Sequence, residues 1–276
     1  VEDFLKISPF ELTPIPWISN GFYYSEEDKP AKHPYYFAGL YYLQEPSAMT
    51  PAYVLPVNPE DKVLDLCAAP GGKSTELGAK LKGTGLLVSN DISASRAKAL
   101  LKNIEVFGIG NVVVTCEYPE KLKERFTGFF DKILVDAPCS GEGMFRKEEI
   151  AISEWSPENV EKCALRQTEI LENAVKCLKG GGYIIYATCT FSLDENEKVI
   201  DAFLKNHPEF ELVPVKEEVK NYTADGIFFT GCATENIHYA RRFYPHKAKG
   251  EGQFMALLHN TLEHNEKSVK KNKKYP

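Results

Sequence analysis

Leu64–Lys73 reads Leu-Asp-Leu-Cys-Ala-Ala-Pro-Gly-Gly-Lys and joins a short apolar run, Val63–Cys67, to a helical pattern, Ser74–Leu81. A glycine turn between a strand and a helix is typical of nucleotide-binding α/β folds. Asp91 lies 20 residues after Gly71, at the offset where an acid accepts hydrogen bonds from ribose hydroxyl groups. The turn and the acid together predict a nucleotide-like cofactor at the carboxyl ends of the strands.

A phosphate-binding P-loop is the second interpretation of this turn. Gly72-Lys73-Ser74 matches the end of the pattern G-x-x-x-x-G-K-[ST]. Cys67, however, stands where the first glycine of that pattern is required, and an aspartate inside the strand, Asp65, is unusual there. Because the dinucleotide pattern GxGxxG is absent as well, S-adenosylmethionine (SAM) is favoured over NAD, and a P-loop ATPase remains an alternative.

Two further segments place a cysteine where an apolar run ends: Asp136–Gly141 (DAPCSG) and Ala187–Thr190 (ATCT). Open α/β sheets bind ligands at the carboxyl ends of their strands. We therefore expect Cys139 and Cys189 to lie beside the cofactor.

Two thiols beside a methyl donor indicate methyl transfer to a carbon that needs covalent activation. Carbon 5 of cytosine is a poor nucleophile until a thiolate adds to carbon 6. One cysteine would then attack and the other would assist release. Asp136 is expected to hydrogen-bond the edge of the base, and Lys73 to support charge or the bound cofactor.

Strand and helix patterns alternate through the middle of the chain, which predicts a doubly wound, mostly parallel α/β sheet. A helix is expected to open at Ser156-Pro157 and to end at Gly180–Gly182, and a capping box of Ser192 and Glu195 is expected to open another. The predicted strands are Val63–Cys67, Leu86–Ser89, Val112–Thr115, Ile133–Val135, Tyr183–Ala187, Phe210–Val213 and Phe254–Leu258.

Composition limits the class of protein. The 276 residues are 43% hydrophobic and 26% charged, with no membrane-span run and no signal-peptide pattern at Val1. Seven cysteines without CxxC pairs argue against a disulfide framework or a structural zinc site and fit a reducing, cytoplasmic location. We expect no metal and no membrane partner, and a monomer. Because the chain lacks an initial Met, we also expect flanking parts to be missing.

The formal net charge of −6 is unusual for a protein that binds nucleic acid, but basic residues gather locally. The segment from His238 to Lys249 has no acidic residue, and its basic and aromatic residues together predict a phosphate contact. Lys267–Lys274 adds five lysines, which are either a solvated tail or a further contact. The basic residues of the first segment are Arg241, Arg242, Lys247 and Lys249, interleaved with Tyr239, Phe243 and Tyr244.

In their order and length, these motifs resemble the Sun/Nop-type RNA 5-methylcytosine methyltransferases, above all the bacterial ribosomal RNA branch. The segments that carry the resemblance, within about residues 30 to 260, are Leu64–Ser74, Asp91, Asp136–Lys147, Gly181–Thr190 and Arg242–Phe254. The resemblance implies a Rossmann-like class I SAM-dependent methyltransferase with a mostly parallel seven-stranded sheet and helices on both faces. It implies Cys189 as nucleophile and Cys139 as the residue needed for product release.

The resemblance also implies the cofactor contacts. They would come from Cys67, Ala68, Ala69, Pro70, Gly71, Gly72, Lys73, Asp91 and Asp136, with Arg96 as a neighbour. Family members usually carry an acid after the third strand that contacts the adenine side, and Glu117 is the candidate here.

The expected substrate is RNA, with ribosomal RNA ahead of transfer RNA, and a noncatalytic RNA-binding assembly factor is the alternative from another class. The expected parts are an aromatic-rich N-terminal subdomain or lid (1–55), a catalytic domain (56–262) and a lysine-rich tail or the start of a further region (263–276). Residues 1–55 hold 12 of the 32 aromatic residues, which either pack as a lid or stack on RNA bases.

Overall fold

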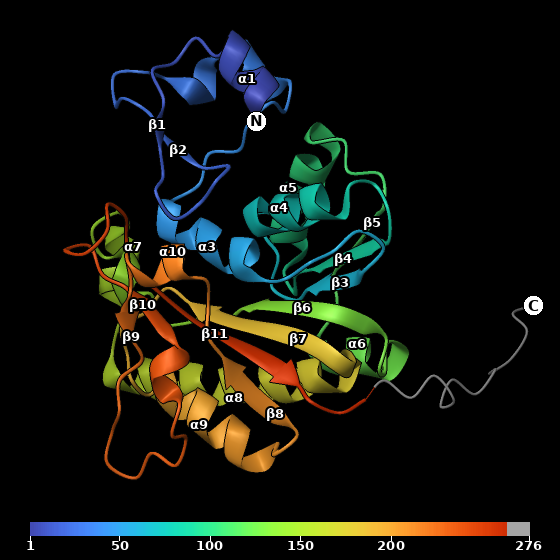
Figure 1. The fold of residues 1–276 in the computed structure, drawn as a ribbon, viewed down its shortest axis with the longest axis vertical. Helices are drawn as coiled ribbons and strands as arrows, with labels where there is room; N and C mark the ends of the chain where they lie inside the picture. The colour runs from blue at the N-terminus through green and yellow to red at the C-terminus, as the bar shows by residue number, and fades with distance from the viewer. Residues whose placement is uncertain (264–276) are drawn as a thin grey trace, which may run out of the picture.

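The computed structural model describes residues 1–263, so the lysines predicted to form a basic tail lie outside the described residues. Figure 1 shows a twisted sheet with helices on both faces and the N-terminal segment at the top of the view, above α3 (Pro46–Val54). Within residues 1–263, no helix is both long enough and apolar enough to cross a membrane.

The main sheet has nine strands in the order β5-β4-β3-β6-β7-β11-β10-β9, with β8 paired to β11. The first five strands in this order are parallel to their neighbours, and the remaining pairs are antiparallel. The strands are β3 (Lys62–Asp65), β4 (Leu86–Asn90), β5 (Val112–Thr115), β6 (Phe130–Asp136), β7 (Leu178–Thr188), β8 (Phe210–Val213), β9 (Ala224–Asp225), β10 (Arg241–Phe243) and β11 (Gln253–Asn260).

The α/β fold with a mostly parallel core is confirmed, and all seven predicted strands are present, but the predicted count of seven is too low. The two additional strands are β9 and β10. Both are too short to show a period of two, and β10 begins with two arginines. They form because β10 pairs with the edge of β11 and β9 then pairs with β10.

Helices cover the two faces of the sheet in separate groups, as Figure 1 shows. Helices α3 and α4 pack on one face, and α6, α8 and α9 lie on the other. The helices are α1 (Glu2–Ile7), α2 (Pro34–Phe37), α3, α4 (Gly72–Leu81), α5 (Ala94–Val106), α6 (Pro119–Arg125), α7 (Glu149–Glu154), α8 (Pro157–Cys177), α9 (Glu197–Asn206) and α10 (Glu217–Lys220).

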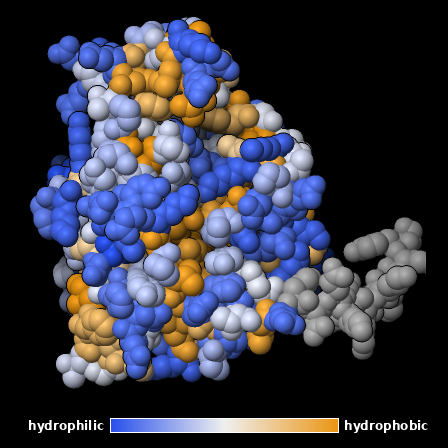
Figure 2. Space-filling view, in the orientation of Figure 1, coloured by the Kyte–Doolittle hydropathy of each residue, from blue (hydrophilic) through white to orange (hydrophobic). Residues whose placement is uncertain are grey.

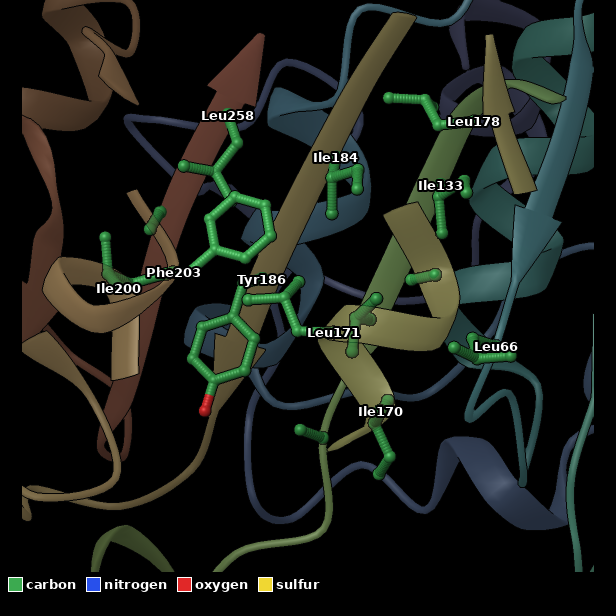
Figure 3. Close-up of a cluster of buried hydrophobic side chains, with 14 of the residues drawn as sticks. Leu66, Ile133, Ile170, Leu171, Leu178, Ile184, Tyr186, Ile200, Phe203 and Leu258 are labelled. Atoms are coloured by element: carbon green, nitrogen blue, oxygen red, sulfur yellow. The ribbon is translucent and has the colours of Figure 1, made fainter. Parts of the chain in front are cut away.

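Alternate side chains of the central strands separate the core into two layers. In β6, Ile133 and Val135 pack with α8 and α9, whereas Leu134 packs with α3 and α4. Figure 3 shows the first of these layers, where Ile133 and Ile184 from the sheet lie near Leu171 of α8. Each fully buried aliphatic side chain contributes roughly 1.5–3 kcal/mol. Together the two layers hold the carboxyl ends of the strands in a fixed arrangement.

Two predicted helix boundaries are wrong. Helix α8 begins after its Ser156 cap as expected but ends at Cys177, and Gly180–Gly182 lie inside β7. A side chain at Gly182 would come within 2.9 Å of the Asp131 carbonyl oxygen, so glycine is required by the close approach of the two strands. Only half of the predicted capping box forms. The Ser192 hydroxyl accepts from the Glu195 backbone at 3.4 Å, but the Glu195 carboxylate bonds to Ser140 and Gln167, and α9 begins later, at Glu197.

The N-terminal segment forms a small hairpin of β1 (Thr13–Pro14) and β2 (Phe22–Tyr23) that is separate from the main sheet. Many of its rings pack on one another, such as Phe10 on Tyr41, and Trp17 is buried and donates a hydrogen bond to Thr50. Hydrophobic residues also gather on its surface at the top of Figure 2. Among the residues of this segment, Phe37 is 68% exposed. The division of the chain at residue 55 stays a prediction.

Candidate active site

The two cysteines singled out in the sequence lie together at the carboxyl end of the sheet. Cys139 follows β6 and Cys189 follows β7, and these strands are parallel neighbours. The two sulfur atoms are 3.4 Å apart. Both residues are partly buried, and all seven cysteines of the chain are free thiols. A pair of thiols at this distance can act on the same bound group.

The surroundings of Cys139 favour its protonated form. Its hydrogen bond to Cys189, and then burial, raise the pKa of Cys139 well above its ordinary value. The negative charge of Glu195 acts in the same direction. Cys139 therefore keeps its proton, and either sulfur can be the donor in the hydrogen bond between the two thiols.

Lys73 and Asp136 form an ion pair beside the thiols. The Lys73 ammonium lies 2.7 Å from Asp136 Oδ2, and the Lys73 side chain is only 10% exposed. Burial opposes the charge on Lys73, but Asp136 outweighs it, so the pKa of Lys73 is raised overall. The ammonium also interacts electrostatically with Cys189. The structure brings Lys73 and Asp136 together, and their predicted roles toward the base and the cofactor stay predictions.

The glycine turn after β3 is held by its backbone. Ala68 donates to the Asn90 carbonyl at 2.7 Å, and the Ala69 carbonyl accepts from Arg96 at 2.9 Å. Gly71 has a φ of +116°, which a residue with a side chain rarely adopts. A side chain at Gly72 would come within 2.7 Å of the Tyr42 ring. Turn geometry and the packing of the N-terminal segment therefore explain both glycines, and their contact with a cofactor stays a prediction.

Carboxylates stand near the carboxyl ends of several adjacent strands. Asp91 follows β4, is 3% exposed, accepts a hydrogen bond from the Ser93 backbone and lies 3.3 Å from Arg96. Glu117 follows β5 with its side chain exposed, and its backbone is fixed by hydrogen bonds with the Asn90 side chain. Asn90 therefore sets the position of Glu117. The strand pattern alone did not identify Asn90 as part of this site.

Asp65, at the end of β3, provides a test of whether this pocket fits a cationic cofactor. Its carboxylate accepts from Ser74 at 2.6 Å, and its other oxygen is buried without a hydrogen-bond partner among residues 1–263. Burial raises the pKa of Asp65 to about 7. A buried carboxylate with one unsatisfied oxygen near Asp91 and Asp136 suits a ligand that carries positive charge and hydroxyl donors. The donor set therefore fits SAM.

Cys67 lies in the same turn. Burial raises the pKa of the Cys67 thiol, so it remains a neutral, inert group. Pro70 takes part in the turn through its carbonyl oxygen, which accepts from Asn103 at 2.7 Å.

The basic segment 238–249 divides into buried arginines and exposed lysines. Arg241 is buried and pairs with Asp225, and Arg242 is buried and pairs with Glu197. The prediction that these arginines contact phosphate is therefore wrong, because both guanidinium groups have carboxylate partners inside the protein. Lys247 and Lys249 are exposed.

A stack of aromatic rings links these lysines to the thiols. Phe191 stacks on Tyr244 with ring centres 5.5 Å apart, and Tyr244 stacks on His246 at 5.3 Å. Phe191 lies two residues after Cys189, and His246 is exposed and precedes Lys247. The stack therefore runs from the thiol pair to a basic surface.

A cavity of about 330 Å³ lies elsewhere, between the N-terminal segment and helices α4 and α5. Aromatic rings line it, including Phe10, Tyr41, Tyr42 and Phe107. It reaches Gly72 at the start of α4, whereas neither Cys139 nor Cys189 lines it. The thiol pair and this cavity are therefore separate features.

Comparison with known proteins identifies two matching families. A family model described as "16S rRNA methyltransferase RsmB/F" matches residues 52–259, and one described as "N-terminal domain of 16S rRNA methyltransferase RsmF" matches residues 1–46. A protein of Escherichia coli O157:H7 named ribosomal RNA small subunit methyltransferase F is 38% identical over 78% of this chain and 47% of its own length. A protein of the same name from Enterobacter sp. (strain 638) is 35% identical over 95% of this chain and 55% of its own length. The chain spans about half the length of these curated relatives.

Solved structures confirm the methyltransferase fold. A methyltransferase homologue from Pyrococcus horikoshii has a TM-score of 0.81 and 30% identity, covering 94% of this chain and 81% of its own. NSun6 from the same organism, solved with SFG, has a TM-score of 0.71 and 28% identity, covering 84% of this chain and 56% of its own.

Proposed function

The chain belongs to the RsmB/F family of 16S rRNA methyltransferases, and from this premise we propose that it is a SAM-dependent RNA cytosine-carbon-5 methyltransferase acting on 16S ribosomal RNA. The observation that carries the proposal is the pair of thiols, 3.4 Å apart, at the carboxyl ends of β6 and β7. A structural cysteine does not require a second thiol at contact distance, whereas in this proposal one thiol forms the covalent adduct and the other assists its breakdown.

Cys189 is the nucleophile in this proposal. Its thiolate forms a bond to carbon 6 of cytosine, and the electron pair of the C5–C6 double bond makes carbon 5 nucleophilic. The positive charge of Lys73 interacts favourably with negative charge on Cys189. Cys139 keeps its proton at this stage, so the two thiols do not compete for the base.

Release follows once carbon 5 has been alkylated. The proton on carbon 5 passes to water, and the electron pair of its bond re-forms the C5–C6 double bond. The bond between carbon 6 and sulfur breaks with its electron pair returning to Cys189, which takes up the proton of Cys139. We assign Cys139 to this step because its sulfur is adjacent to the sulfur that must leave.

Asp136 would orient the base. One of its oxygens stays paired with Lys73, and a carboxylate has further acceptor sites. The exocyclic amino group of cytosine is a hydrogen-bond donor that carboxylates accept. The ion pair with Lys73 therefore fixes an acceptor that distinguishes cytosine from uracil, which lacks that donor.

The cofactor would be held along the ends of β3, β4 and β5. Asp91 would accept from the ribose hydroxyls, the turn from Cys67 to Lys73 would line the amino-acid side, and Glu117 would lie on the adenine side. When bound, SAM supplies an electrophilic methyl group. The unsatisfied oxygen of Asp65 supports a cationic ligand at this site.

The RNA would approach over the stack of Phe191, Tyr244 and His246. Aromatic rings stack on unpaired bases; His246 is exposed, and Phe191 and Tyr244 are half-buried. Lys247 and Lys249 supply positive charge that the chain as a whole lacks. Because a duplex hides carbon 6 within the base stack, we expect a looped or flippable cytosine to be preferred.

The proposal is tested by methyl transfer from labelled SAM to unmodified 16S rRNA, with transfer RNA in a parallel reaction and bisulfite mapping of the product. We expect label in 16S rRNA at a cytosine, and none with Cys189→Ser. RNA binding without transfer, in a protein shown to bind SAM, would support the noncatalytic assembly factor instead. Label in transfer RNA alone would reassign the substrate.

A further inference from the structure

Three consecutive polar residues at the start of α9 are completely buried: Glu195, Asn196 and Glu197. Burying two carboxylates and an amide is costly unless each is hydrogen-bonded. Glu195 and Asn196 bond to the segments that carry the two thiols, and Glu197 pairs with Arg242, which donates to the Phe191 carbonyl.

Glu195 anchors the segment that carries Cys139. Its carboxylate accepts from the Ser140 backbone at 2.9 Å, from the Ser140 hydroxyl at 2.5 Å and from the Gln167 amide at 2.8 Å. The same Gln167 amide also donates to the Pro138 carbonyl at 3.0 Å. The residues on both sides of Cys139 are therefore fixed through one carboxylate.

Asn196 anchors the segment that carries Cys189. Its side-chain oxygen accepts from the Thr188 hydroxyl at 2.6 Å, and its amide donates to the Thr190 carbonyl at 3.0 Å. The residues on both sides of Cys189 are therefore fixed by one side chain.

The two anchors are connected. The hydroxyl groups of Ser140 and Thr190 lie 2.8 Å apart and join the two segments. Behind them, Glu197 pairs with Arg242, which also donates to the Phe191 carbonyl at 2.9 Å. Two adjacent residues, Glu195 and Asn196, thus hold the loops that carry Cys139 and Cys189, which are 50 residues apart in the sequence.

We propose that Glu195 and Asn196 are positioning residues with separate tasks, Glu195 for Cys139 and Asn196 for Cys189. The inference rests on the proposed function, because it assigns each anchor to the step that its thiol performs. Glu195 then governs breakdown of the covalent RNA adduct, and Asn196 governs its formation.

Two isosteric substitutions separate these tasks. Glu195→Gln brings an amide donor to a point where three donors converge, so the Ser140 segment shifts. Asn196→Asp places a second acceptor against the Thr190 carbonyl, so the Cys189 segment shifts. A displacement of about 1 Å at a reacting group costs up to about a hundredfold in rate. Asp194→Asn is the matched control, because this exposed carboxylate pairs with Lys198 and with neither thiol segment.

The experiment is rapid quenching of the full chain with SAM and 16S rRNA, followed by denaturing gels that measure formation and decay of the adduct. For Glu195→Gln we expect formation near the control rate and decay slowed about tenfold or more, so that adduct accumulates. For Asn196→Asp we expect formation slowed about tenfold or more and little adduct. Asp194→Asn should match the unmodified chain.

Ser140→Ala keeps the test decisive if Glu195→Gln fails to fold. It removes the contacts of the Ser140 hydroxyl with Glu195 and Thr190 but leaves those of Asn196 with Thr188 and Thr190. It is therefore expected to slow decay by a smaller factor than Glu195→Gln, and to slow formation less than Asn196→Asp. Equal slowing of both steps in every variant, or lower melting temperatures with unchanged rates, would overturn the separate roles. If the unmodified chain transfers no methyl group and Cys139→Ser traps no adduct, the proposed function itself has failed.

Discussion

The glycine turn at residues 67–73 and the two thiol segments at 138–141 and 188–191 lie at the same edge of the sheet but are held differently. In the turn, the exposed Arg96 and the half-buried Asn103 donate to the Ala69 and Pro70 carbonyls. In the thiol segments, the backbone is held by completely buried side chains from α8 and from the residues just before α9.

Because of this difference, we expect substitutions in the two regions to affect different properties, cofactor affinity in one and stability in the other. Substitution of Asp91 is expected to change cofactor affinity while the fold survives, because the hydrogen bonds of Arg96 and Asn103 to the turn remain in place. Substitutions in the support of the thiol segments leave buried charges unpaired, and so lower stability and activity together.

Arg242→Met should have the largest effect on stability. It leaves Glu197 buried without its ion-pair partner, and breaking a buried pair in this way costs about 3–5 kcal/mol. Urea unfolding measures the change. The double variant Arg242→Met/Glu197→Met should recover most of the loss, since no charge is then left unpaired. A loss below about 1 kcal/mol in the single variant would show that the ion pair of Arg242 with Glu197 contributes little to the free energy of unfolding.

The pH dependence of the unfolding free energy, compared between Asp65→Asn and the unmodified chain, tests the cofactor side of the sheet. Burial raises the folded-state pKa of Asp65 from 3.8 to about 7. Folding therefore favours the protonated form of Asp65. Its contribution to the free energy of unfolding is fully present below pH 3.8 and is lost as the pH rises to about 7. Relative to Asp65→Asn, the unmodified chain should lose stability over this range, by a few kcal/mol. Unfolding free energies that run parallel for the two proteins from pH 4 to pH 7 would contradict the shift.

Asp91→Ala should weaken SAM binding by about 1–3 kcal/mol, the scale expected for losing a charged hydrogen-bond partner. Calorimetry measures the affinity. Asp91→Asn is the matched variant, because its side-chain oxygen still accepts from the Ser93 backbone and preserves the loop. Unchanged affinity in both folded variants would remove Asp91 from the cofactor site.

The double variant Lys247→Ala/Lys249→Ala should have the smallest effect. Loss of two phosphate contacts should reduce the slope of log affinity against log salt concentration by about 1.4 for single-stranded RNA. Lys176→Ala, at the far end of α8, is the control and should leave the slope unchanged. An identical slope in the double variant would place the RNA on another surface.

The sequence predicted the features that depend on local pattern. All seven strands with an apolar pattern are present, and the ends of β6 and β7 bring Cys139 and Cys189 together. The ion pair of Lys73 with Asp136 joins two segments that the sequence had also assigned to the site.

Features set by distant partners could not be predicted in this way. Glu195 matched a capping-box pattern, but its carboxylate is held by Ser140 and Gln167, which are far from it in sequence. Arg241 and Arg242 looked like a phosphate contact until folding placed Asp225 and Glu197 beside them. The sequence did contain one signal, the three consecutive polar residues Glu195, Asn196 and Glu197 before an apolar helix. They indicate a supporting role only when they are known to be buried.

The most direct test of covalent catalysis by the thiol pair is a denaturing gel of each cysteine variant after reaction with SAM and 16S rRNA. Cys139→Ser should give a protein–RNA band that survives SDS and heat, because attack by Cys189 proceeds while release stalls. Cys189→Ser and the double variant should give no band and no methylation, since a hydroxyl is a far weaker nucleophile. A stable band with Cys189→Ser and none with Cys139→Ser would reverse the two roles, and full turnover by both single variants would contradict covalent catalysis by these thiols.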